Sequence, residues 1–190
     1  MNRAVMTLCL CLAASAAQAE MLDINLSSNA LRGSFSAPLS SVFPRLGGVY
    51  DAGALIGEQD DRNVRQGHLG VLVTGDAGAR DANVTAGLGG RLVLLDVADV
   101  SGGALALGGQ FEARIPAFNR IGMIAYVYGA PRASAFGDLD GYLEYALSAD
   151  YQVLRQASIY LGYRQLKLDI ENIGTVTADN GLHVGLRLSF

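Results

Sequence analysis

The side chains in this sequence that could do chemistry are charged and polar residues set at every second position of short apolar segments. Arg187, for example, stands between Leu186 and Leu188 near the carboxyl end. Side chains that alternate in this way share one face of a β-strand. Such a face could line a polar channel, or its charges could pair and fill a narrow barrel, and we expect the filled arrangement. The predicted inward-facing, lumen-lining residues are Arg91, Glu112, Glu144, Asp150, Arg164, His183 and Arg187.

Catalysis would have to use one of two histidines, His68 and His183. A hydrolase of the serine type needs a hydroxyl nucleophile beside a histidine and an acid. Ser189 shares a face with His183 but lies at the very end of its segment, and Gly185 offers no side chain. We therefore expect no enzymatic activity. Two histidines also predict no transition-metal site, and no motif predicts a cofactor.

Residues 1–19 have the features of a cleavable signal peptide. Arg3 supplies the positive start, residues 5–14 form an apolar core, and residues 17–19 give the small-x-small cleavage pattern. Both cysteines, Cys9 and Cys11, lie in this segment, so the mature chain contains no thiol for a disulfide or a metal. Residues 20–190 are expected to form a single domain. With 14 Lys and Arg against 18 Asp and Glu, the chain lacks the basic surface that a nucleic-acid partner requires.

After the leader, apolar and polar residues alternate in short segments separated by turn residues. Alternation with a period of two predicts strands. No segment approaches the roughly 20 apolar residues of a spanning helix, so this chain could cross a membrane only as a closed barrel. The expected strands lie at 22–26, 31–35, 48–57, 67–74, 84–95, 103–112, 121–129, 141–151, 158–169 and 181–190. Both faces of 121–129 are apolar, so its register stays open.

The strand count depends on Ser28 and Asn29, which form either a tight hairpin or a bulge. The count is ten with a hairpin and nine with a bulge, and a single-chain bacterial barrel needs an even number. We therefore predict an all-β, antiparallel, up-and-down transmembrane barrel of ten strands. The alternative has eight strands, with the amino-terminal segment inside or beside the barrel. Long polar loops are expected at 58–65, 130–140 and 171–180, at the end opposite the short turns 116–119 and 152–156, as in outer-membrane barrels.

Several segments resemble a known family. They are 126–131 with 135–138, the strand 147–151, the strand 159–164 and the ending 185–190. Together they resemble the YfaZ family of outer-membrane proteins, most closely over the carboxyl-terminal part. The terminal Phe190 also resembles the closing residue that the barrel-assembly machinery reads. The resemblance implies an exported protein of the Gram-negative outer membrane, in contact with lipid and lipopolysaccharide, and it implies no catalytic residue.

Three functions remain open on the sequence. The first is a structural or porin-like outer-membrane barrel whose lumen is largely filled by charged side chains. The second is a soluble periplasmic barrel that binds an apolar ligand, and the third is an outer-membrane hydrolase with its site at the rim. The distribution of charge separates the first two, because a soluble barrel needs its charged face outside and its apolar face inside.

Overall fold

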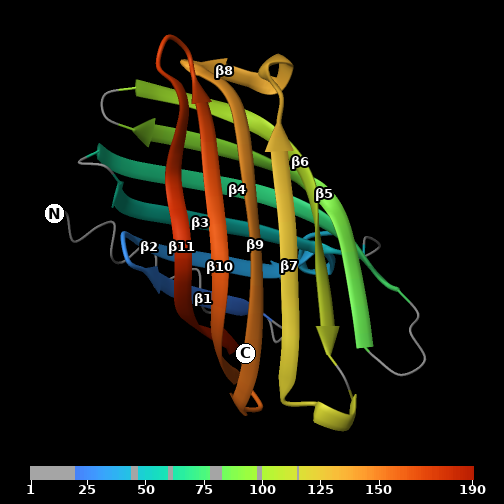
Figure 1. The fold of residues 1–190 in the computed structure, drawn as a ribbon. Coiled ribbons are helices and arrows are strands. Elements are labelled where there is room, and N and C mark those ends of the chain that lie inside the picture. Colours follow the sequence, from blue (N-terminus) through green and yellow to red (C-terminus); the bar gives the residue numbers. More distant parts are fainter. Residues whose placement is uncertain (1–19, 44–46, 60–61, 78–82, 98–99, 115) are drawn as a thin grey trace, which may run out of the picture.

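Alternating sequences of this kind form strands whose backbone groups must all find partners, and here the strands close on themselves (Figure 1). The computed structural model describes residues 20–43, 47–59, 62–77, 83–97, 100–114 and 116–190. The predicted signal peptide, with Cys9 and Cys11, lies outside the described residues. Among the described residues, no helix is long and apolar enough to cross a membrane.

The barrel has ten antiparallel strands, as predicted. In order around the barrel they are β1 (Met21–Ser27), β2 (Ala30–Pro38), β3 (Val49–Gln59), β4 (Arg62–Asp76), β5 (Asn83–Val97), β6 (Val100–Arg114), β7 (Ile121–Ala130), β9 (Leu139–Leu154), β10 (Ala157–Ile170) and β11 (Gly174–Ser189). β1 pairs with β11 and so closes the sheet, and the strands of the two walls cross at a steep angle (Figure 1).

Short elements complete the chain. A three-residue strand, β8 (Ala135–Gly137), pairs with β6 at the end of the barrel opposite the carboxyl end of β11 (Figure 1). Three single 3-10 turns lie between strands: η1 (Leu39–Ser41), η2 (Pro116–Phe118) and η3 (Arg132–Ser134). Ser28 and Asn29 connect β1 to β2 as the tight hairpin that the ten-strand count requires.

The predicted long loops are wrong, because paired strands occupy most of their length. β3 ends at Gln59 and β4 begins at Arg62, so strands occupy most of 58–65. β11 begins at Gly174, so the last turn holds only residues 171–173. Asn172 with φ 61° and Gly174 with φ 93° make this turn tight. Residues 130–140 likewise contain η3, β8 and the start of β9. The longest connections now include residues 39–48, at the end that holds the carboxyl terminus.

A β-bulge explains why the alternation predicts a last strand only from residue 181, whereas β11 begins at Gly174. Leu166 pairs with Asp179 and Lys167 with Thr177, so Ala178 is the extra residue. Ala178 and Asp179 are adjacent and both buried. The alternation therefore changes phase at this point, and a strict period of two cannot be followed through it.

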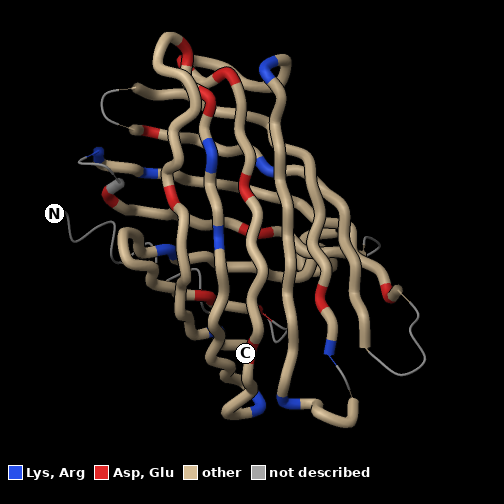
Figure 2. Tube along the Cα trace, in the orientation of Figure 1, with Lys and Arg blue, Asp and Glu red and all other residues tan. Residues whose placement is uncertain are grey.

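The outer surface of the barrel is apolar. Leu88 and Leu107 have exposed fractions of 75% and 69%, which are typical of side chains that point away from the sheet into the surroundings. β7 contains no charged residue, and its register is now fixed with Met123 and Val127 outside and Tyr128 inside. Figure 2 shows the charged residues as scattered positions, some along the strands and others at the turns at the two ends of the barrel.

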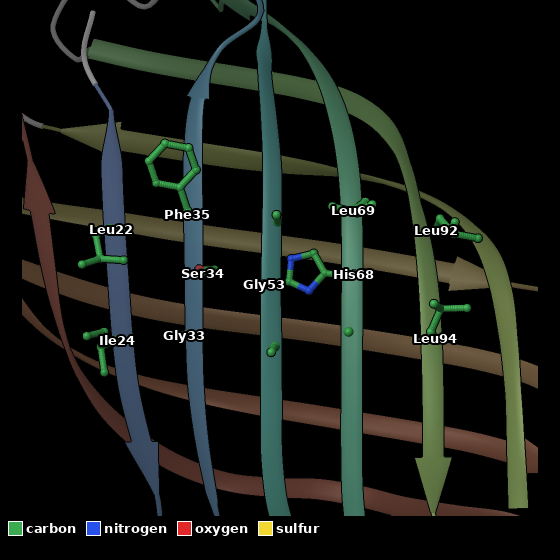
Figure 3. Close-up of a pocket in the computed structure, with 13 residues that line it drawn as sticks. Leu22, Ile24, Gly33, Ser34, Phe35, Gly53, His68, Leu69, Leu92 and Leu94 are labelled. Carbon is green, nitrogen blue, oxygen red and sulfur yellow. The ribbon is translucent and has the colours of Figure 1, made fainter. Parts of the chain in front are cut away.

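A shallow hollow crosses the outer surface of β1 to β5. Gly33, Ala54 and Gly67 stand side by side on neighbouring strands and leave it without large side chains. Phe35 and Leu69 rise beside it, as the labelled side chains show (Figure 3). The hollow has a volume of about 600 Å³ and an almost wholly apolar surface. It belongs to the same outer belt as the exposed leucines.

The interior has an apolar layer at the end away from the termini. Val93, Leu166 and Leu168 have exposed fractions of 0%, and Leu95 and Ile170 are also buried. These residues lie near the far ends of β5 and β10 and pack in one cluster. Each such side chain stabilises the folded state by roughly 1.5–3 kcal/mol relative to exposure.

The apolar outer belt can be tested with an arginine scan of two positions. We expect Leu161→Arg, in the belt, to lower the free energy of refolding into lipid vesicles by about 2–4 kcal/mol. Thr175→Arg lies on the extension of β11 beyond the belt and should refold normally. Heat-modifiable gel migration and urea titration measure both variants. Equal refolding of the two would show that the belt is misplaced.

Candidate functional site: the charged interior

The structure turns all seven predicted residues toward the barrel interior. Arg91, Glu144, Asp150, Arg164 and His183 are buried, with exposed fractions of 1–7%. Glu112 and Arg187 are half-buried nearer the end that holds the termini. The residues do not gather at one point. Arg91, Glu144, Asp150, Arg164 and Arg187 belong to five separate ion pairs at different heights in the lumen. Among the described residues, no ion pair includes Glu112 or His183.

Glu144 is the centre of the most buried of these groups. Its carboxylate accepts hydrogen bonds from Arg32, from Tyr142 and from Tyr126 at 2.8 Å. The amide of Gln66 donates in turn to the Tyr142 hydroxyl at 3.0 Å. The network joins β2, β4, β7 and β9 across the lumen. This buried carboxylate accepts hydrogen bonds from three side chains, and one of them, Arg32, also neutralises its charge.

Arg164 forms the second buried group. Its Nη2 and Nε lie 2.5 Å and 2.6 Å from Oδ2 of Asp179, and its Nη1 donates to Oδ1 of Asn25 at 3.0 Å. Asp179 points inward because it continues the alternation of His183 and Arg187 along β11 up to the bulge. Asn25 belongs to β1, so the group also ties the closing seam together.

Arg91 belongs to a third group with Asp51 and His68. Nη2 of Arg91 and Nε2 of His68 lie 3.0 Å and 2.8 Å from Oδ2 of Asp51. The guanidinium of Arg91 stacks 3.9 Å from the centre of the Tyr128 ring, where the aromatic face stabilises its charge. His68 lies against Gly53 on the neighbouring strand, where a Cβ would come within 2.5 Å of its ring (Figure 3).

Two further ion pairs lie toward the end of the barrel that holds the termini. Arg114 binds Asp150 at 2.8 Å, and Arg187 binds Asp23 at 3.2 Å. The Tyr160 hydroxyl donates to Asp23 at 2.5 Å and its ring covers Gly185. The side chains of these pairs do not fill the lumen at this end.

The unfilled part of the lumen is a cavity of about 260 Å³, called the polar cavity below because charged and polar side chains form much of its lining. Arg91, Arg164 and His183 line its inner part, and Met21 and Glu112 line it nearer the termini. The cavity therefore extends from the buried ion pairs toward the end of the barrel that holds the termini. On its other side lies the apolar layer of β5 and β10.

Both histidines make contacts inside the lumen. Nε2 of His68 is held by Asp51, and His183 packs edge-on against Tyr160 at a centroid distance of 5.7 Å. Ser27, the register partner of His183 on β1, donates to the backbone oxygen of Ala30 and to Asp179, and Ser148, in the same row, donates to the backbone oxygen of Ile124. Among the described residues, no group of three or more His, Cys, Asp or Glu is placed to hold a metal ion.

Sequence reasoning missed several members of these groups. The missed residues include Asp23, Arg32, Asp51, Tyr126, Tyr142 and Asp179. Arg32 and Asp51 carried a usable signal, because each is a charge that alternates with apolar or small residues in an expected strand. Tyr126 lay in the segment whose register was open. Asp179 lay beside the bulge, in a segment expected to be a loop.

Protein families, curated proteins and solved structures differ in how closely they resemble this chain. No curated protein matches it. One solved structure, described as "Unveiling the Mechanism Behind the in-meso Crystallization of Membrane Proteins", is 11% identical, with a TM-score of 0.41 over 90% of this chain and 83% of that chain. That likeness is too distant to support a conclusion about fold or function. A family model described as "YfaZ precursor" matches residues 1–190, and the chain therefore belongs to the YfaZ family.

Proposed function

We propose that this protein is an outer-membrane β-barrel whose interior is closed to solutes at the end away from the termini. The observation that carries the proposal is the filled lumen, in which the Glu144 network lies beside an apolar layer of fully buried side chains. A barrel of few strands has a lumen only wide enough for its own side chains.

The apolar outer belt supports a location in the membrane. A soluble periplasmic barrel that binds an apolar ligand would expose charge on the outer faces of its strands, whereas here Leu88 and Leu107 are exposed. Arg32, Arg91 and Arg164 are buried inside. A contiguous apolar surface of this kind is costly in water and stable in lipid. The predicted signal peptide and the family also support export. Lipid and lipopolysaccharide are the proposed partners of the belt, and the assembly machinery is the proposed reader of Phe190.

The barrel is proposed to act without catalysis. Both histidines are engaged in packing or ion pairing, as described above, and each arginine of the described lumen is paired with a carboxylate. Its role is then mechanical or interactive, through the outer belt and the two ends of the barrel, and any porin-like role requires that the lumen be opened.

Closure of the lumen predicts the electrical behaviour of the protein. We expect the refolded mature protein to show no steady conductance in a planar lipid bilayer. Replacing both Leu166 and Leu168 with Ser should hydrate the apolar layer and give measurable ion current. The matched control replaces Leu161 and Leu182, on the outer surface, with Ser and should stay silent.

Folding of each variant is verified by heat-modifiable gel migration before the current is recorded. Steady, ion-selective current through the unaltered protein would overturn the closed lumen. Silence of the folded Leu166 and Leu168 variant would show that the apolar layer is not what closes it.

The Glu144 network predicts a large and asymmetric effect on stability. Glu144→Ala leaves Arg32 buried without its carboxylate and should lower the free energy of unfolding by about 3–5 kcal/mol. The double variant Arg32→Met, Glu144→Leu removes both charges and should lose less. Urea unfolding in lipid vesicles measures the difference, with exposed Glu58→Ala as the control. Equal midpoints for the Glu144 and Glu58 variants would refute the role assigned to the network.

Cell fractionation tests the location directly. The proposal expects the mature protein in the outer-membrane fraction, resistant to extraction with carbonate and starting at Glu20. Recovery in the soluble periplasmic fraction would instead support the ligand-binding alternative.

A further inference from the structure

We propose that the polar cavity binds a small organic cation, with the carboxylate of Glu112 as its counter-ion. The inference extends the proposed function, because an outer-membrane barrel with an even number of strands has both termini on the periplasmic side, and the cavity lies at that end. It depends on that function only for the side from which the cation enters, because binding itself can be measured on the folded protein in detergent.

The argument begins with the pairing of charges in the lumen. Each arginine of the described interior is matched with one carboxylate within 3.2 Å. The matched pairs are Arg32 with Glu144, Arg91 with Asp51, Arg114 with Asp150, Arg164 with Asp179, and Arg187 with Asp23. Glu112 is the one interior acid, among the described residues, that has no such partner. The cavity wall therefore carries an uncompensated negative charge.

Arg114 lies two positions from Glu112 on the same face of β6, but its guanidinium is bound to Asp150 at 2.8 Å, and no ion pair joins Glu112 to a cation among the described residues. On β6, Glu112 stands between Thr85 of β5 and Ile124 of β7. Thr74 and Gln110 line the cavity one row deeper. A half-buried carboxylate in this setting lacks both full hydration and a counter-charge, so a cation that enters the cavity gains more than it would at an exposed acid.

The pairing of the lumen charges also argues against an anion as the ligand. The guanidinium of every lumen arginine already contacts a carboxylate, and Arg91 additionally faces the rings of Tyr126 and Tyr128. An anion would have to separate a buried ion pair, which is costly. An ammonium group, in contrast, finds acceptors that are free, in the carboxylate of Glu112, the hydroxyls of Thr74 and Thr85 and the amide oxygen of Gln110.

The size of the cavity limits the ligand. A volume of about 260 Å³ holds a chain of a few carbon atoms with its polar ends, and excludes a folded peptide. The polar lining makes an apolar molecule a poor occupant, since it would leave these groups without hydrogen bonds. The chemistry that fits is a short primary amine or diamine.

Three probes of the same chain length separate charge from shape. Butane-1,4-diamine, butane-1,4-diol and butanedioate carry ammonium, hydroxyl and carboxylate ends on one carbon skeleton. Titration calorimetry on the refolded mature protein in zwitterionic detergent measures each. We expect the diamine to bind at least tenfold more tightly than the diol, and the dianion not to bind.

A matched pair of variants places the site. Glu112→Gln keeps the shape of the side chain, removes its charge and should weaken diamine binding at least tenfold. Glu58→Gln removes an exposed acid at the opposite end of the barrel and should leave binding unchanged. Heat-modifiable migration verifies that both variants are folded.

Three results would overturn the proposal. They are absence of diamine binding to the folded protein, equal binding of diamine and diol, and unchanged diamine affinity in Glu112→Gln. Failure of the proposed function has a different signature. If the unaltered protein conducts ions while diamine binding still depends on Glu112, the lumen is open and the cation site stands.

Discussion

The interior of this protein is governed by the geometric link between strand number and lumen width. A closed sheet satisfies its own backbone hydrogen bonds, which is the condition for a strand-built protein to enter lipid. With ten strands, the space inside is little wider than the side chains that point into it. Every second residue must therefore be chosen for how it fits and pairs with residues on the opposite wall. The ion pairs, the apolar layer and the glycines beside large side chains are the outcome.

The filling is divided by height. Toward the end away from the termini the lumen resembles the core of a soluble β-sandwich, with aliphatic side chains from both walls in contact. In the middle, charges are buried in pairs with additional hydrogen bonds, as Arg164 is with Asp179 and Asn25. Near the termini the pairs stand farther apart and a polar cavity remains. The lumen is thus closed by the apolar layer at one end and contains the polar cavity toward the other.

Much of this fold could be predicted from the period of two. It identified ten strands, the hairpin at Ser28 and Asn29, and a polar face carrying residues such as Arg91 and Glu144. It failed where the alternation is interrupted or hidden. The bulge at Ala178 interrupts the alternation within the expected loop 171–180, so the inward Asp179 was missed, and the uniformly apolar β7 concealed the inward tyrosines. Pairings such as Arg32 with Glu144 join residues far apart in sequence, and their match depends on the register of many strands.

The unequal lengths of β1 and β11 have a consequence for the mechanics of the barrel. β1 has 7 residues and β11 has 16, so the closing seam is much shorter than the neighbouring β10–β11 ladder. Beyond the seam, Asp179 reaches across to Ser27 and Asn29 accepts from Glu58 of β3. The short seam is the joint at which the cylinder is easiest to unzip. Opening this seam alone would leave the ten strands as one open sheet with β1 and β11 as its edges, because β2 stays paired with β3 along its length.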